Sequence, residues 1–173
     1  MTKWKWILAG FLIAAAPLIV YAQAKPEHEP LKPRVPPSAM AKAKGMKPPM
    51  PSSPGVIAEG KTLFTGKATC FVCHGMEGKG DGPGAAGTSV GPRNFTNPAF
   101  HKAKTCGELF WVAANGSMGD HSGEDPSHED GTGMVPYLQG HTSELDLDGT
   151  PTVNEEELWK IVHFEASLGG AKC

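Results

Sequence analysis

The chain of 173 residues is long enough for one domain with a hydrophobic core and short appendages. Its formal net charge is only −2, but the charges are unevenly divided. Residues 25–54 contain six basic and two acidic side chains, whereas residues 55–173 contain eight basic and sixteen acidic ones. A domain with this acidic excess and no nucleic-acid motif is not expected to bind DNA or RNA.

Residues 1–24 have the features of a secretory signal peptide. Lys3 and Lys5 precede an apolar run from Trp6 to Val20, and Ala22-Gln23-Ala24 is the small-x-small pattern that signal peptidase accepts. Cleavage is therefore expected after Ala24. The apolar run also approaches the roughly 20 residues that a membrane helix needs, so an uncleaved anchor is the alternative. Both alternatives export the domain, which predicts a periplasmic protein that meets the membrane only if the anchor is retained.

Residues 25–54 differ from the rest of the chain in composition. They contain nine prolines and almost no large apolar side chain. Such a segment cannot bury enough surface to offset its loss of conformational entropy on folding. The composition predicts an extended, disordered linker, with the folded domain at 55–173.

The pentad Cys70-Phe71-Val72-Cys73-His74 is the strongest motif in the chain. A C-x-x-C-H sequence is typical of covalent haem attachment, in which both thiols bond to haem vinyl groups and the histidine is an iron ligand. A redox-active dithiol would require a βαβ context, and a zinc site would require a second pair of ligands. The glycine-rich segment that follows supports neither alternative, so one covalent haem c is predicted.

Start and stop signals predict helices around this motif. Ser53 and Pro54 can begin a helix over about 55–69. A capping box at Thr105-x-x-Glu108 begins a second helix that ends at Asn115-Gly116, and Asn154-x-x-Glu157 begins a third over about 155–168. Residues 75–94, rich in glycine, should form an Ω-like loop. The expected fold is all-α.

The ordered set of these motifs resembles the class I cytochromes c, in the small bacterial mono-haem group. The resemblance covers residues 55 to about 169. It includes Gly60-x-x-x-Phe64 before the pentad, Gly91-Pro92-Arg93-Asn94-Phe95-Thr96 after it, then Gly133-Met134-Val135-Pro136-Tyr137, and a last helix around Trp159 and Phe164. It implies a cytochrome c fold in which Ile161 and Phe164 lie against Gly60 and Phe64.

The resemblance also implies the iron ligands. His74 is the proximal ligand, and the carbonyl of Pro92 is expected to accept its Nδ1–H, which fixes the tautomer and strengthens the imidazole as a donor. Met134 is the expected distal ligand, because flanking glycines let its backbone approach the haem. The rivals for the distal position are Met118, His121, His128 and His141.

The chain departs from the family pattern in an acidic insertion at 118–130. No Lys or Arg occurs between Thr105 and Trp159, whereas acidic residues are frequent there, among them Asp120, Glu124, Asp125, Glu129, Asp130, Glu144, Asp146 and Asp148. This pattern is typical either of a solvated acidic face or of a surface that attracts a redox partner with a basic docking face.

The predicted function is single-electron transfer between redox partners, without a catalytic residue. The alternatives are a haem enzyme with an open iron site, or a haem subunit tethered to a larger oxidoreductase.

Cys106 and Cys173 are the only cysteines outside the pentad, and an oxidising compartment favours a disulfide between them. Two free thiols, or pairing between chains, are the alternatives.

Overall fold

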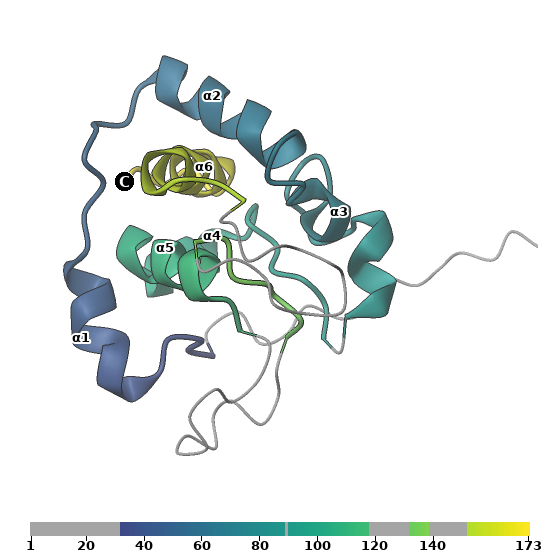
Figure 1. The fold of residues 1–173 in the computed structure, drawn as a ribbon, viewed down its shortest axis with the longest axis horizontal. Coiled ribbons are helices and arrows are strands. Elements are labelled where there is room, and N and C mark those ends of the chain that lie inside the picture. The colour runs from purple at the N-terminus through teal and green to yellow at the C-terminus, as the bar shows by residue number, and fades with distance from the viewer. Residues whose placement is uncertain (1–31, 89, 118–131, 139–151) are drawn as a thin grey trace, which may run out of the picture.

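The computed structural model describes residues 32–88, 90–117, 132–138 and 152–173. All regular elements of the described residues are helices, so the all-α prediction is confirmed. The elements, in chain order, are α1 (Pro37–Gly45), α2 (Pro54–Thr65), α3 (Phe71–His74), the 3₁₀ helix η1 (Pro83–Gly87), α4 (Pro98–Ala103), α5 (Cys106–Asn115) and α6 (Glu155–Leu168). Figure 1 shows α6 between α2 and α5, with α1 beside α5.

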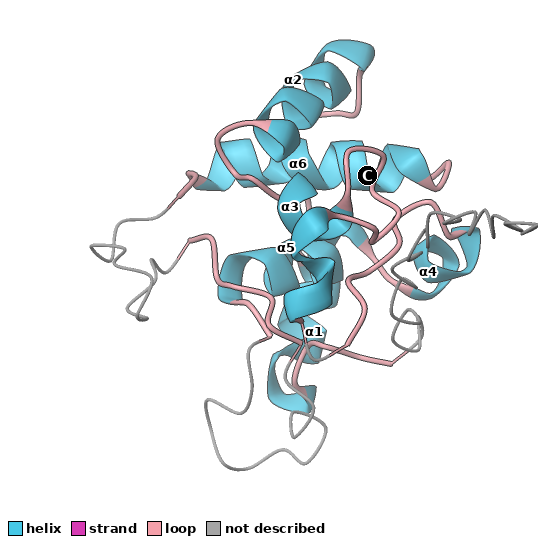
Figure 2. Ribbon diagram, turned by 90° about the vertical axis from the view of Figure 1, so that its right-hand side faces the viewer, coloured by secondary structure: helices cyan, strands magenta, loops and turns pink. Residues whose placement is uncertain are grey.

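Helices α2 and α6 cross in contact, as Figures 1 and 2 show from two directions. The crossing is close because Gly60 has no side chain: a Cβ there would collide with the backbone carbonyl of Lys160. Beside it, the rings of Phe64 and Phe164 meet edge to face with centroids 5.2 Å apart. This confirms the predicted contact between the two helices. Helix α2 ends at Thr65, four residues before the predicted boundary.

The predicted helix starts are present. The Ser53 Oγ accepts the Val56 N–H at 3.2 Å, with Pro54 at the first helical position. Both capping boxes form, at Thr105 for α5 and at Asn154 for α6. Each satisfies amide groups that the first helical turn leaves without partners, a contribution of about 1 kcal/mol per cap.

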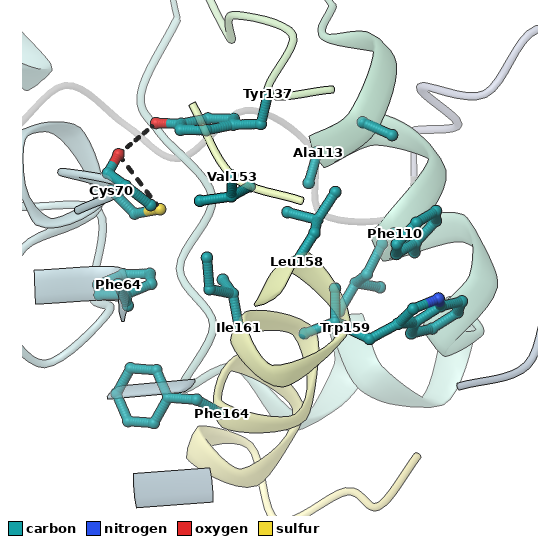
Figure 3. Close-up of a cluster of buried hydrophobic side chains, with 14 of the residues drawn as sticks. Phe64, Cys70, Phe110, Ala113, Tyr137, Val153, Leu158, Trp159, Ile161 and Phe164 are labelled. Atoms are coloured by element: carbon teal, nitrogen blue, oxygen red, sulfur yellow. Dashed lines mark hydrogen bonds between the residues drawn. The ribbon is translucent and has the colours of Figure 1, made fainter. Parts of the chain in front are cut away.

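The core lies between α5 and α6 and extends to the segment before α3 (Figure 3). Phe110 of α5 stacks on Trp159 of α6, with centroids 4.1 Å apart and planes 14° from parallel. Leu158 and Ile161 of α6 are likewise buried. Burial of each such side chain stabilises the fold by roughly 1.5–3 kcal/mol, which makes α6 the main apolar support of the domain.

The N-terminal segment differs from the prediction. It was expected to be extended up to residue 54, but residues 37–45 form α1, which packs on α5. Ala43 is fully buried, and a Cβ at Gly107 would collide with its carbonyl, so the two backbones are in close contact. Further along, the Nε2–H of His163 in α6 donates to the carbonyl of Met50 at 3.3 Å. Local helix propensity and these contacts compensate for the high proline content.

Several sequence predictions fall outside the described residues. They concern the leader at 1–24, the acidic insertion at 118–130, and the rival ligands Met118, His121, His128 and His141. Within the described ranges, no helix is both long enough and apolar enough to cross a bilayer.

A disulfide links the first residue of α5 to the segment after α6. The Sγ atoms of Cys106 and Cys173 are at bonding distance, 2.08 Å, and their Cα atoms are 5.6 Å apart. This bond connects the start of α5 to the segment that follows α6, and it closes a loop with a sequence separation of 67. It leaves Cys70 and Cys73 as free thiols.

Removing this bond should destabilise the domain. Closing a loop of this length restricts the unfolded chain, so the Cys106→Ser/Cys173→Ser variant should lose up to about 4 kcal/mol of unfolding free energy. Chemical denaturation of the haem-loaded protein measures the loss. Mass measurement after alkylation provides the check: the unreduced, denatured protein should take up no label at these positions, and two labels would contradict the bond.

Candidate functional site

The C-x-x-C-H pentad forms the short helix α3 at the edge of a cavity. The His74 N–H donates to the Cys70 carbonyl at 2.9 Å, so one helical turn brings both thiols to the same side. Cys70, Cys73 and His74 all line this cavity. Just before the pentad, the carbonyl of Ala68 accepts a hydrogen bond from the Tyr137 hydroxyl at 2.9 Å (Figure 3). This bond fixes the chain at the start of the turn.

The environment of the two thiols differs from that of a redox-active dithiol. Burial raises the pKa of Cys70, and the charge of Glu165 raises it further. Burial also raises the pKa of Cys73. A catalytic redox cysteine needs a lowered pKa, because the thiolate is the nucleophile. The environment of these two cysteines therefore does not favour a redox-active dithiol.

The imidazole of His74 is held in the form that binds iron. Its Nδ1–H donates to the carbonyl of Arg93 at 3.0 Å, and its ring stacks on Phe95 with centroids 4.6 Å apart. Burial, with a smaller effect from the Arg93 charge, lowers the His74 pKa to about 4 despite the opposing hydrogen bond. The ring is thus neutral at physiological pH, with its Nε2 lone pair available to a metal.

The hydrogen-bond acceptor for His74 is a correction to the prediction. The sequence pattern assigned the role to the carbonyl of Pro92, but the structure places the carbonyl of Arg93 there. The carbonyl of Pro92 instead approaches Gly80, where a Cβ would lie 2.5 Å from it. The segment thus presents successive carbonyls to two different neighbours. Pro92 still lines the cavity.

The segment carrying Met134 is attached to the end of α5. The Ser117 N–H donates to the Met134 carbonyl at 2.8 Å, and the Tyr137 N–H donates to the Ala113 carbonyl at 3.0 Å. These bonds hold the glycine- and proline-flanked segment against the helix. Met134 lines the same cavity as His74, which brings together the two residues predicted as iron ligands.

Sequence reasoning missed several residues of the cavity wall. Glu165 of α6 lines it and is only 4% exposed, and burial raises its pKa to about 8. A signal was present, because Glu165 follows Leu158, Ile161 and Val162 at helical spacing on the inward face. Other wall residues that the sequence did not suggest are Lys32, Arg34, Val35, Phe100 and Lys104.

The wall composition fits a haem. The exposed surface of the cavity wall is mainly apolar, and His74 and Met134 both line it together with the thiols of Cys70 and Cys73. A macrocycle with apolar faces, covalent attachment points and axial coordination requires this combination.

Comparisons with known proteins agree with this geometry. The sequence model of the Cytochrome c family matches residues 57–168, more than half of the chain. No curated protein matches the chain. Among solved structures, a chain of the reducing HAO-like protein complex of Kuenenia stuttgartiensis is similar, at 23% identity and a TM-score of 0.50. The match covers 72% of this chain and 47% of that one, so this chain spans about half the length of that relative.

At such identity the structural likeness shows a shared fold. The family match shows more, because it includes the C-x-x-C-H pentad at residues 70–74 and the segment of Met134. On the family match and the geometry of the cavity, the chain belongs to the cytochrome c family, whose members bind haem c covalently.

Proposed function

We propose that this protein is an exported mono-haem cytochrome c that carries single electrons between redox partners, with His74 and Met134 as axial ligands. Family membership supports electron transfer through haem c. The observation that carries the finer proposal is the single cavity lined by Cys70, Cys73, His74 and Met134. The periplasm is the proposed location, because covalent haem attachment, the leader at residues 1–24 and a disulfide all agree with an oxidising compartment.

Bound haem c supplies the Fe(III)/Fe(II) couple. Cys70 and Cys73 hold the group covalently, and His74 offers a neutral Nε2 whose direction is fixed by the bond to Arg93. The thioether of Met134 favours ferrous iron and so raises the potential. The apolar wall limits access of water to the iron. None of these roles requires a group that transfers protons to a substrate.

A redox titration followed by visible spectra tests the proposal on the mature protein. The expected result is one haem that titrates as a single one-electron couple, with a low-spin spectrum in both oxidation states. A high-spin ferric spectrum would contradict two protein ligands on the iron. It would favour the alternative of an enzyme with an open haem site.

The sequence between residues 106 and 158 leads to a prediction about partners. It has no basic side chain and many acidic ones, so a partner with a basic docking face should be attracted to it. Electron transfer to the physiological partner should therefore slow as salt rises, since the Debye length falls to about 8 Å at 0.15 M. Stopped-flow rates over a salt series measure this. Rates that do not vary with ionic strength would contradict it.

Two exposed apolar side chains support docking near the attachment site. Val72 and Met76 are 37% and 54% exposed, and they lie within and just after the pentad.

A subunit role in a larger oxidoreductase is the second candidate, supported by the solved relative that belongs to a protein complex. Purification from native membranes under mild conditions distinguishes the two, because a subunit should co-elute with its complex at a fixed ratio.

A further inference from the structure

Residues 93–95 contact the imidazole of His74 in two ways. The carbonyl of Arg93 accepts the Nδ1–H of His74 at 3.0 Å, and the ring of Phe95 stacks on the imidazole with planes 24° from parallel. Phe95 is itself buried, and its backbone N–H donates to the carbonyl of Gly78 at 2.7 Å. A movement of this short segment would therefore change both the hydrogen bond and the orientation of the His74 ring.

Two contacts from α4 fix this segment. The Nε2–H of His101 donates to the carbonyl of Phe95 at 2.7 Å, across a sequence separation of six residues. Beside it, the guanidinium of Arg93 lies over the ring of Phe100, 4.9 Å from the centroid, in cation–π geometry. The neutral ring with its proton on Nε2 and the cationic ring both donate such a hydrogen bond, so the contact of His101 does not depend on its titration.

The imidazole of His101 is also packed against the end of α6. A Cβ at Gly169, the residue after this helix, would collide with Cδ2 of His101 and would lie 2.6 Å from its Nε2. The rings of Phe100 and His101 meet edge to face, with centroids 5.0 Å apart. His101 thus lies between the end of α6 and the carbonyl of Phe95, and turning the ring away would break contacts on both sides.

We propose that His101 is a positioning residue that sets the reduction potential of the haem by fixing residues 93–95 against His74. His101 holds the carbonyl of Phe95, and this keeps the carbonyl of Arg93 at the Nδ1–H of His74. A firm hydrogen bond at Nδ1 makes the imidazole a stronger donor, which favours ferric iron and lowers the potential. The proposal rests on His74 as an iron ligand, as in the proposed function, but on no particular distal ligand and on no partner.

The His101→Leu variant of the full-length, haem-loaded protein tests the proposal. Loss of the donor should loosen residues 93–95, so the reduction potential should rise above that of the wild type. Solvent exchange of the His74 Nδ1–H, followed by NMR on the ferrous protein, should become roughly 2- to 12-fold faster, the factor that one net hydrogen bond contributes to a local opening. His101→Gln should return both values toward the wild type, because its amide nitrogen can donate to the carbonyl of Phe95.

His163→Leu is the matched control. It also removes a histidine that donates to a backbone carbonyl, but this carbonyl belongs to Met50 in the N-terminal segment. The control should lose stability, while its potential and its His74 exchange rate stay at the wild-type values. Equal changes in His163→Leu and His101→Leu would overturn the proposal, because they would reflect a general loss of stability. Wild-type values in His101→Leu would overturn it as well.

Gly169→Ala decides if His101→Leu does not accumulate with haem. This variant retains the imidazole, and the backbone at Gly169, with φ −97°, accepts alanine. The new Cβ takes the place of the ring, so the ring must move away from the carbonyl of Phe95. A raised potential with faster exchange supports the proposal, and wild-type values reject it. A wild-type protein without a low-spin spectrum would instead contradict the proposed function, whatever the variants show.

Discussion

The Met134→Ala variant should lose methionine ligation of the haem iron, and its reduction potential should fall by a sizeable part of the about 0.8 V range that axial ligands cover. Met134 lines the cavity of His74, and its carbonyl is fixed by the Ser117 N–H, so the loss of its sulfur cannot be replaced by a small shift of the segment. A thioether stabilises ferrous iron, and water in its place does not. Ferric absorption and a redox titration measure the two effects.

Met118→Ala is the matched control, because it removes the rival sulfur and leaves Met134 in place. It should retain the weak long-wavelength band that methionine-ligated ferric haem shows in this family, and its potential should remain near that of the wild type. The opposite pattern would overturn the assignment: a band that survives Met134→Ala and disappears in Met118→Ala would make Met118 the ligand.

The features that sequence predicted well are those that local chemistry determines. A capping box needs only residues three apart, and the starts of α5 and α6 are where Thr105 and Asn154 predict them. The crossing at Gly60 follows from helical spacing combined with the family pattern. The all-α fold and the covalent haem follow from motifs whose meaning does not depend on distant parts of the chain.

The features that sequence did not predict depend on contacts between distant segments. Ala39, Ala41 and Ala43 with their neighbouring lysines are good helix formers, but the surrounding prolines suggested an extended chain. The packing of α1 against Gly107, a contact between distant segments, favours the helix over the extended chain. Likewise, both Pro92 and Arg93 have carbonyls that could meet His74, and the three-dimensional path of the segment selects the second.

Glu165 provides the other prediction with a large effect, because it is a carboxyl group on the apolar face of α6. Its neighbours at the cavity are Tyr137, whose pKa burial also raises, and Cys70, the proposed site of thioether attachment. Burial raises the Glu165 pKa from its ordinary 4.5 to about 8. Near neutral pH the folded domain therefore keeps this group protonated, whereas the unfolded chain ionises it.

This difference predicts how stability changes with pH. Below about pH 4.5 both states hold the proton, and burial of Glu165 carries no ionisation penalty. As pH rises to about 8, only the unfolded state loses the proton, so the unfolding free energy falls by about 1.4 kcal/mol per unit. The accumulated loss is on the order of several kcal/mol, and it levels off above the folded-state pKa.

Glu165→Gln should remove this loss, because the amide has nearly the same shape and does not ionise. Denaturation of the haem-loaded protein between pH 5 and 9 should show that the variant's stability advantage over the wild type grows with pH and reaches a plateau above about 8. Glu155→Gln, on the exposed first turn of the same helix, is the control and should follow the wild-type curve. A constant difference between Glu165→Gln and wild type at every pH would contradict the prediction, because it would mean that folding does not raise the Glu165 pKa.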